Sequence, residues 1–135
     1  MSITKVFTDG ASRGNPGESG VGVLIIDNDG KKTELKKYLG KKTNNQAEYS
    51  ALILALENLS HLKGSEIIIQ TDSQLMANQM NGSWRVKDEG LKSLFSKAKK
   101  LSQEYKSLTI AYIPRTQNKE ADRLANEAIN EYFND

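Results

Sequence analysis

Apolar and polar residues alternate along the N-terminal third of the chain with the period of two that is typical of β-strands. This pattern predicts strands over residues 2–8, 20–27 and 32–39. In the first strand the odd-numbered residues from Ile3 to Asp9 share one face, and the even-numbered residues from Thr4 to Thr8 share the other. The sequence Asn28-Asp29-Gly30 predicts a tight turn between the second and third strands, so we expect three antiparallel neighbours.

The hydrophobic period changes to that of a helix in the middle of the chain. Helices are expected over residues 45–60, 73–80, 89–105 and 119–133. In the first helix one face should be buried, formed by Ala47, Ala51, Leu54, Ala55 and Leu62. Residues 66–71 form a nearly continuous apolar run and predict a strand covered on both faces, and residues 108–113 predict the last strand. This order of predicted strands and helices indicates an α/β fold in a single domain over residues 1–135.

A glycine-rich stretch follows Asp9 directly and contains Gly10, Gly14, Pro16 and Gly17. This composition predicts a sharp turn that leaves the Asp9 carboxylate at a strand end, where a ligand can approach the backbone closely. An Asp-Gly pair is also an ordinary turn signal, so Asp9 gains meaning only from the other acids.

Three more acids stand at the ends of predicted elements. Asp72 follows the strand at residues 66–71, whereas Glu48 and Asp122 lie in the first turns of helices. Each has a purely structural alternative: Asn45 and Glu48 fit a capping box, Asp72 or Ser73 fits an N-cap, and the helix dipole favours Asp122. Ligands of α/β sheets bind beyond the carboxyl ends of the strands, where these acids would converge. Clustered carboxylates repel one another unless they are protonated or bind cations, and oxygen ligands favour Mg²⁺ or Mn²⁺.

Composition narrows the classes of protein further. The chain has no cysteine, which excludes disulfides and thiolate metal sites. No apolar run approaches the ~20 residues needed to cross a bilayer. We therefore expect a soluble, cytoplasmic protein without a membrane partner. We also expect a monomer. The formal charge is only +2, but setting aside four clustered acids leaves 13 of the 17 acids against 19 basic residues. That excess of positive charge favours a polyanionic partner.

Lysines concentrate on two predicted elements. Those on and around the third strand either protect an exposed sheet edge or face phosphates: Lys31, Lys32, Lys36, Lys37, Lys41 and Lys42. Those on the helix at residues 89–105 are expected to form a solvated face: Lys92, Lys97, Lys99 and Lys100.

Four separated segments give the chain a resemblance to a known family. They are Phe7-Thr8-Asp9-Gly10-Ala11-Ser12, Thr43-Asn44-Asn45-Gln46-Ala47-Glu48, Thr71-Asp72-Ser73-Gln74 and Asn118-Lys119-Glu120-Ala121-Asp122. In this order and on these elements, the chain resembles type 1 ribonuclease H, which cuts the RNA strand of RNA/DNA hybrids. The resemblance implies a ribonuclease H-like fold: a mixed five-stranded sheet, three strands antiparallel and two added parallel to the first, with helices on both faces.

The resemblance also implies site residues. Asp9, Glu48, Asp72 and Asp122 would be catalytic and would bind two Mg²⁺ ions about 4 Å apart, with Mn²⁺ as a substitute, leaving 5′-phosphate and 3′-hydroxyl ends. Contacts to the minor groove of the hybrid are implied for Asn15, Asn44, Asn45 and Gln74, and nucleic-acid contacts also for Gly10, Ala11 and Ser12. Thr43 would contact a DNA phosphate, and Trp84 would either pack on the DNA strand or lie in the core.

Two features depart from the family pattern. Longer members carry a basic insertion before the long helix, whereas residues 81–88 here form only a short connection. Many members also have a histidine in the loop before the last acid; here Arg115 lies in that loop as an auxiliary candidate, and His61 is expected at the surface. Two alternatives therefore stay open: a nucleic-acid-binding protein that is catalytically weak or silent, and a structure-selective DNA nuclease.

Overall fold

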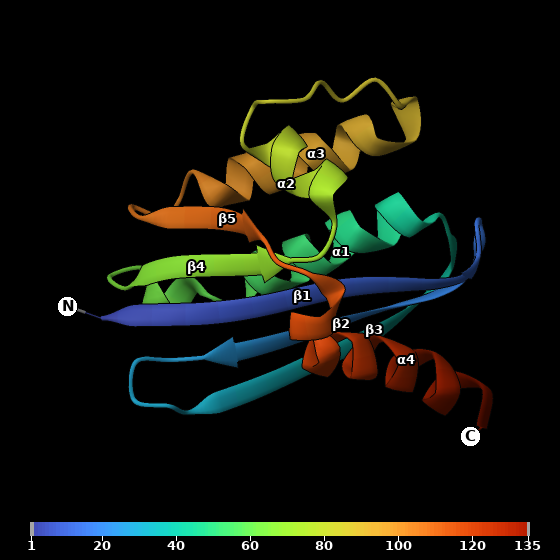
Figure 1. Ribbon diagram of the computed structural model, residues 1–135, viewed down its shortest axis with the longest axis horizontal. Helices are drawn as coiled ribbons and strands as arrows, with labels where there is room; N and C mark the ends of the chain where they lie inside the picture. The colour runs from blue at the N-terminus through green and yellow to red at the C-terminus, as the bar shows by residue number, and fades with distance from the viewer. Residues whose placement is uncertain (1, 135) are drawn as a thin grey trace.

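The computed structural model describes residues 2–134 and contains one mixed sheet of five strands (Figure 1). The strands are β1 (Ile3–Gly14), β2 (Gly17–Ile26), β3 (Lys32–Lys42), β4 (Glu66–Thr71) and β5 (Leu108–Tyr112). They lie in the order β3-β2-β1-β4-β5. The first three pair antiparallel, and β4 and β5 run parallel to β1, as predicted.

Within residues 2–134, four α-helices and two short 3₁₀ helices lie between the strands or after the last one. They are α1 (Asn44–Glu57), η1 (Ser60–Leu62), α2 (Gln74–Met80), α3 (Glu89–Ser102), η2 (Arg115–Gln117) and α4 (Lys119–Asn134). Helix α1 packs between the sheet and α3, whereas α4 packs on the sheet on its own, away from the other three (Figure 1). The prediction of helices on both faces is confirmed. Within residues 2–134, no helix has the length and apolar character of a membrane span.

The main hydrophobic core lies between the sheet and α1. The even-numbered residues of β1, from Thr4 to Thr8, are completely buried there, and they share one face of the strand as the alternation predicts. Helix α1 is buried more widely than the single predicted face: Leu54 is only half-buried, whereas Tyr49 and Leu52 are inaccessible. The reason is that α3 covers the side of α1 that the sheet leaves open.

Strand β1 is longer than predicted, and the predicted turn directly after Asp9 is wrong. Its ladder with β2 continues from Asp9, paired with Gly22, as far as Gly14, paired with Gly17. The chain reverses only at the next two residues, Asn15-Pro16, which are joined by a cis peptide bond. Asp9 therefore lies inside a long strand, and it is the parallel neighbour β4 that ends beside it, because the last pair between the two strands is Thr8 with Thr71.

Glycines let two helices approach the sheet from opposite faces. A Cβ atom on Gly10 would lie 2.2 Å from the carbonyl carbon of Ala47 in α1, and one on Gly22 would lie 2.2 Å from the carbonyl oxygen of Ala121 in α4. Gly22 pairs with Asp9, and directly opposite residues of an antiparallel pair point to the same face. Asp9 therefore points toward the α4 face of the sheet.

The predictions for β3 and β4 have different outcomes. β3 lies at one edge of the sheet, in agreement with its many lysines, and Lys36 there pairs with Glu127 and Glu131 of α4. The expectation that β4 is covered on both faces is wrong, because Ile68 and Gln70 on its second face are only half-buried. Helix α4 packs on β1, β2 and β3, so that face of β4 receives less cover.

Candidate active site

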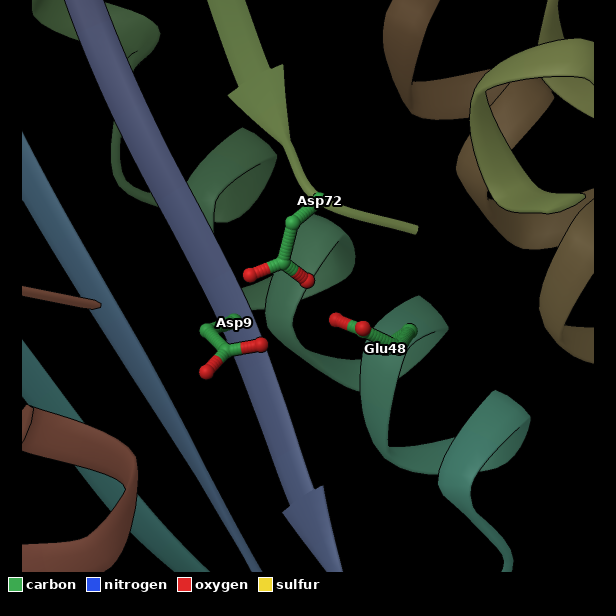
Figure 2. A group of neighbouring side chains, drawn as sticks. All are labelled: Asp9, Glu48 and Asp72. Carbon is green, nitrogen blue, oxygen red and sulfur yellow. The ribbon is translucent and has the colours of Figure 1, made fainter. Parts of the chain in front are cut away.

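Three carboxylates from different elements meet at the end of β4. Each of Asp9, Glu48 and Asp72 has an oxygen that lies within 4.8 Å of an oxygen of the other two. Figure 2 shows the three side chains turned toward one another, from β1, α1 and the segment after β4. Asp9 and Asp72 follow the last parallel pair, Thr8 and Thr71, so the register itself places them next to each other, as predicted.

The start of α1 leaves Glu48 free for this cluster. The predicted capping box with Asn45 and Glu48 is wrong, because the N-cap is Thr43 and its partner is Gln46. Gln46 donates its backbone N–H to Thr43 Oγ1 at 3.1 Å, and Thr43 N–H donates to Gln46 Oε1 at 2.9 Å. Glu48 Oε1 instead accepts a 2.8 Å hydrogen bond from the backbone N–H of Gly10. The Glu48 side chain of α1 therefore contacts the backbone of β1.

Asp72 is likewise free of capping, since Ser73 is the N-cap of α2 and accepts from Met76 N–H at 3.1 Å. The Asp72 carboxylate instead accepts a 3.3 Å hydrogen bond from Nδ2 of Asn118. The same Nδ2 donates to the carbonyl oxygen of Thr8 at 2.9 Å. Asn118 thus joins β1, the segment after β4 and the start of α4.

Asn118 was not among the site residues predicted from the sequence. Its side chain is buried, with 1% of its surface exposed, and its Oδ1 has no hydrogen-bond partner among the described residues. The sequence signals for it are its place in the fourth family segment, Asn118 to Asp122, and its position directly before α4, where asparagine is common as a helix cap.

Asp122 lies in the first turn of α4 and lines the same cavity, although its carboxylate is outside the group of three. The cavity has a volume of about 490 Å³. Besides the four acids, its lining consists of Gly10, Ala11, Ser12, Arg13, Asn44, Arg115 and Asn126. The structure therefore brings all four predicted acids to one polar cavity, and Arg115 lies beside them.

Burial and mutual repulsion make the cluster unfavourable as a set of free anions. Loss of hydration and then the charges of Glu48 and Asp72 raise the pKa of Asp9 to about 9. Burial raises the pKa of Glu48 to about 8 despite the hydrogen bond from Gly10, and burial also raises the pKa of Asp72. Arg115 acts in the opposite direction, since its charge lowers the pKa of both Glu48 and Asp72. Bound cations would relieve the same repulsion.

The residues predicted to contact nucleic acid lie around this cavity and along the start of two helices. Asn15, in the turn after β1, accepts the backbone N–H of Asn44 on its Oδ1 at 3.0 Å, so its amide nitrogen stays available. Asn44 and Asn45 are exposed in the first turn of α1, and Gln74 is exposed at the start of α2. These positions leave polar donors on the surface, but the capping role of Thr43 already occupies its hydroxyl oxygen as an acceptor.

Trp84 lies in the short connection before α3 with 46% of its surface exposed, so the alternative of a core tryptophan is wrong. It lines a second hollow of about 410 Å³ together with Arg85, Lys92 and Phe95. Lys99, by contrast, is half-buried and donates to the carbonyl oxygen of Met80 at 3.1 Å, so it does not belong to a solvated face. His61 is exposed on η1, as expected.

Comparisons with known proteins agree with this architecture. The family model described as Reverse transcriptase-like matches residues 7–128. The chain is 39% identical over 126 residues to a bifunctional protein of Mycobacterium tuberculosis, and 40% identical over 126 residues to ribonuclease HI of Halobacterium salinarum. These matches cover 92% and 93% of this chain but 35% and 63% of those proteins, so the chain spans about a third of the length of the first.

A solved structure gives a match over the whole fold. The chain superposes on LC11-RNase H1 in complex with an RNA/DNA hybrid with a TM-score of 0.90 and 40% identity. The match covers 96% of this chain and 99% of that one.

Proposed function

Because the chain belongs to the type 1 ribonuclease H family, we propose that it is an endonuclease that hydrolyses the RNA strand of RNA/DNA hybrids. The observation that carries the proposal is the cluster of Asp9, Glu48 and Asp72 where β4 ends beside its parallel neighbour β1, with Asp122 on the same cavity. The hybrid bound to the similar LC11-RNase H1 supports the choice of substrate.

The donor set fits divalent magnesium. All four side chains offer hard carboxylate oxygens, and the described residues contribute no thiolate ligand. Burial raises the pKa of Asp9 and Glu48, and a bound cation would favour the ionised form of both. We propose that Asp9, Glu48, Asp72 and Asp122 bind two Mg²⁺, with Mn²⁺ as a substitute. When bound, the ions supply an activated water and stabilise the leaving 3′ oxygen.

The protein's own part in the reaction is positioning. Gly10 N–H and Asn118 Nδ2 hold the carboxylates of Glu48 and Asp72 in place before substrate arrives. If water attacks the phosphorus and the bond to the 3′ oxygen breaks, the products would carry 5′-phosphate and 3′-hydroxyl ends, and no covalent nucleophile is needed. We assign Arg115 an auxiliary role, since its charge already acts on Glu48 and Asp72 and would attract a phosphate at the same place.

Recognition of RNA would come from the minor-groove side of the hybrid. Asn15, Asn44, Asn45 and Gln74 offer amides for hydrogen bonds to bases and 2′-hydroxyls, and the backbone around Gly10, Ala11 and Ser12 lines the cavity itself. On the DNA strand, Thr43 would donate its hydroxyl hydrogen to a phosphate, and the exposed ring of Trp84 would pack on a sugar or base.

A cleavage assay tests the proposal. A labelled RNA/DNA hybrid is incubated beside duplex DNA, duplex RNA and each single strand, with Mg²⁺, with Mn²⁺ or with a chelator. We expect cleavage of the RNA strand of the hybrid alone, in either metal, and none in chelator or with the Asp9→Asn variant. Cleavage of duplex DNA, or hybrid binding without cleavage by the unaltered protein, would contradict the proposal.

A further inference from the structure

Arg13 lies on the rim of the acid cavity, four residues beyond Asp9 on β1. Arg13 is exposed, and among residues 2–134 no carboxylate lies at ion-pair distance from its guanidinium. Glu18, the residue opposite it on β2, instead accepts a hydrogen bond from the hydroxyl of Tyr38. Arg123 shows the contrast, because it pairs with three carboxylates. Arg13 therefore has no direct ion-pair partner among the described residues, although it lines the same cavity as the four acids.

The protein contacts of Arg13 use only part of its guanidinium. Nη2 donates to Oδ1 of Asn126 at 3.3 Å and to the carbonyl oxygen of Asn126 at 3.4 Å, both neutral acceptors on α4. A guanidinium carries five N–H donors, so several of those on Arg13 remain free. The planar arrangement of these donors suits a phosphate group, which accepts two parallel hydrogen bonds.

Asn126 continues this contact to the fourth acid. A guanidinium can only donate and a carboxylate can only accept, so the amide of Asn126 has a single orientation that satisfies both neighbours. In that orientation its Oδ1 faces Arg13, and its Nδ2 donates to Oδ1 of Asp122 at 3.3 Å and to the carbonyl oxygen of Asp122 at 3.0 Å. The three residues form a chain of hydrogen bonds from the rim to the acid.

We propose that Arg13 binds a backbone phosphate of the RNA strand at the rim of the cavity, and that Asn126 is a positioning residue that orients the Asp122 carboxylate. This inference rests on the proposed function and adds two residues to it. Arg13 supplies a fixed cation where the polyanion passes the acids, and Asn126 ties that cation to α4 so that both keep one geometry. The sequence alone gives no sign of this link, since 113 positions separate Arg13 and Asn126.

The phosphate contact is tested by binding in an Asp9→Asn background, in which the hybrid stays intact. Affinity for a labelled RNA/DNA hybrid is measured over a series of salt concentrations for Arg13→Ala, Arg13→Lys and Lys106→Ala. Lys106 is a matched control, because it is exposed before β5, at the opposite end of the parallel strands from the acids. We expect Arg13→Ala to bind roughly tenfold more weakly and to lower the salt slope by about one. Arg13→Lys should keep the slope and lose part of the affinity.

The positioning role is tested in the active protein. Asn126→Ala should lower kcat several-fold and raise KM less than Arg13→Ala does, whereas Arg13→Ala should act mainly on KM, and both should melt close to the unaltered protein. If Arg13→Ala binds like Lys106→Ala, or if Asn126→Ala keeps its kcat, the inference is wrong even where the unaltered protein cleaves the hybrid. If the unaltered protein neither binds nor cleaves the hybrid, the proposed function fails first.

Discussion

The backbone N–H of Gly10 donates a 2.8 Å hydrogen bond to Oε1 of Glu48, and this bond joins β1 to α1 inside the acid cluster. The two elements can come this close only because residue 10 has no side chain. A Cβ atom there would lie 2.2 Å from the carbonyl carbon of Ala47 and 2.4 Å from the backbone nitrogen of Glu48. The hydrogen bond that orients Glu48 therefore requires glycine at residue 10, because a side chain there would keep the two backbones apart.

Gly10→Ala should displace α1 from the strand and disturb Glu48. We expect a loss of about 1–3 kcal/mol in the free energy of unfolding, together with a large loss of hybrid cleavage. Urea unfolding and kcat measure the two effects. Gly64→Ala is the matched control, because nothing lies within 4 Å of a Cβ atom at residue 64. Equal stability of the two variants would show that α1 can shift without cost.

The metal-free protein should lose stability as pH rises. The pKa of Asp9 is raised to about 9 and that of Glu48 to about 8, both well above the ordinary values of 3.8 and 4.5. Each folded-state pKa exceeds the unfolded one, so the folded state holds these protons more tightly and their stabilising effect disappears between about pH 4 and pH 9. Thermal melts in chelator measure this effect. The free energy of unfolding of Asp9→Asn, relative to that of the unaltered protein, should rise across this range, by on the order of 2 kcal/mol at the alkaline end.

Adding Mg²⁺ at pH 8.5 supplies the control for this effect. A cation that binds only the folded state stabilises it, so the melting temperature of the unaltered protein should rise and that of Asp9→Asn should rise less. A difference between the two proteins that stays constant from pH 5 to pH 9 in chelator would contradict the raised pKa of Asp9.

Asn118 should contribute to the stability of the fold, although it lies outside the helices and strands. Asn118→Ala removes the donor to the buried carbonyl oxygen of Thr8 and to Asp72, at an expected cost of about 1–3 kcal/mol in stability. Asn118→Asp should be worse above neutral pH, because it adds a carboxylate beside Asp72, and it should recover as pH falls and the acids become protonated. Chemical unfolding at pH 5 and pH 8 distinguishes the two variants. An Asn118→Asp variant as stable as Asn118→Ala at both values would refute this account.

The sequence predicts the meeting of Asp9 and Asp72 well, because each directly follows the apolar part of a strand and the two strands are parallel neighbours, whose last pair is Thr8 with Thr71. It does not predict where β1 ends. Gly10 to Gly14 have the composition of a turn, but pairing with residues 17–21 of β2 extends them into strand. That pairing is a tertiary contact, and local propensity does not report it.

The supporting residues are harder to predict than the acids. The hydrogen bond from Asn118 to Thr8 joins residues 110 positions apart, and neither residue has a local pattern that announces it. The capping box shows the opposite error: Asn45 and Glu48 fit the motif but lie two residues after the true pair, Thr43 and Gln46, and only the extended backbone at Thr43 decides between them. Motif spacing identifies the four acids, whereas tertiary packing determines which polar groups orient their carboxylates.

Arg115 should assist turnover without being essential. It lies on η2, lines the acid cavity and lowers the pKa of Glu48 and Asp72 through its charge. Arg115→Ala should therefore lower kcat about tenfold, far less than Asp9→Asn, and shift the acidic limb of the pH–rate profile upward, because the two carboxylates then ionise later. Arg115→Lys should keep the position of that limb.

An arginine stays protonated throughout the working range, so it can attract a phosphate but cannot exchange a proton usefully. We therefore expect no inflection in the rate near pH 6.5, where a catalytic histidine would titrate, and no effect of His61→Ala, since His61 is exposed on η1. Measuring kcat from pH 5.5 to pH 9 for Arg115→Ala, Arg115→Lys and His61→Ala on one hybrid checks each point. An unchanged kcat in Arg115→Ala, or a collapse in His61→Ala, would show that the auxiliary group lies elsewhere.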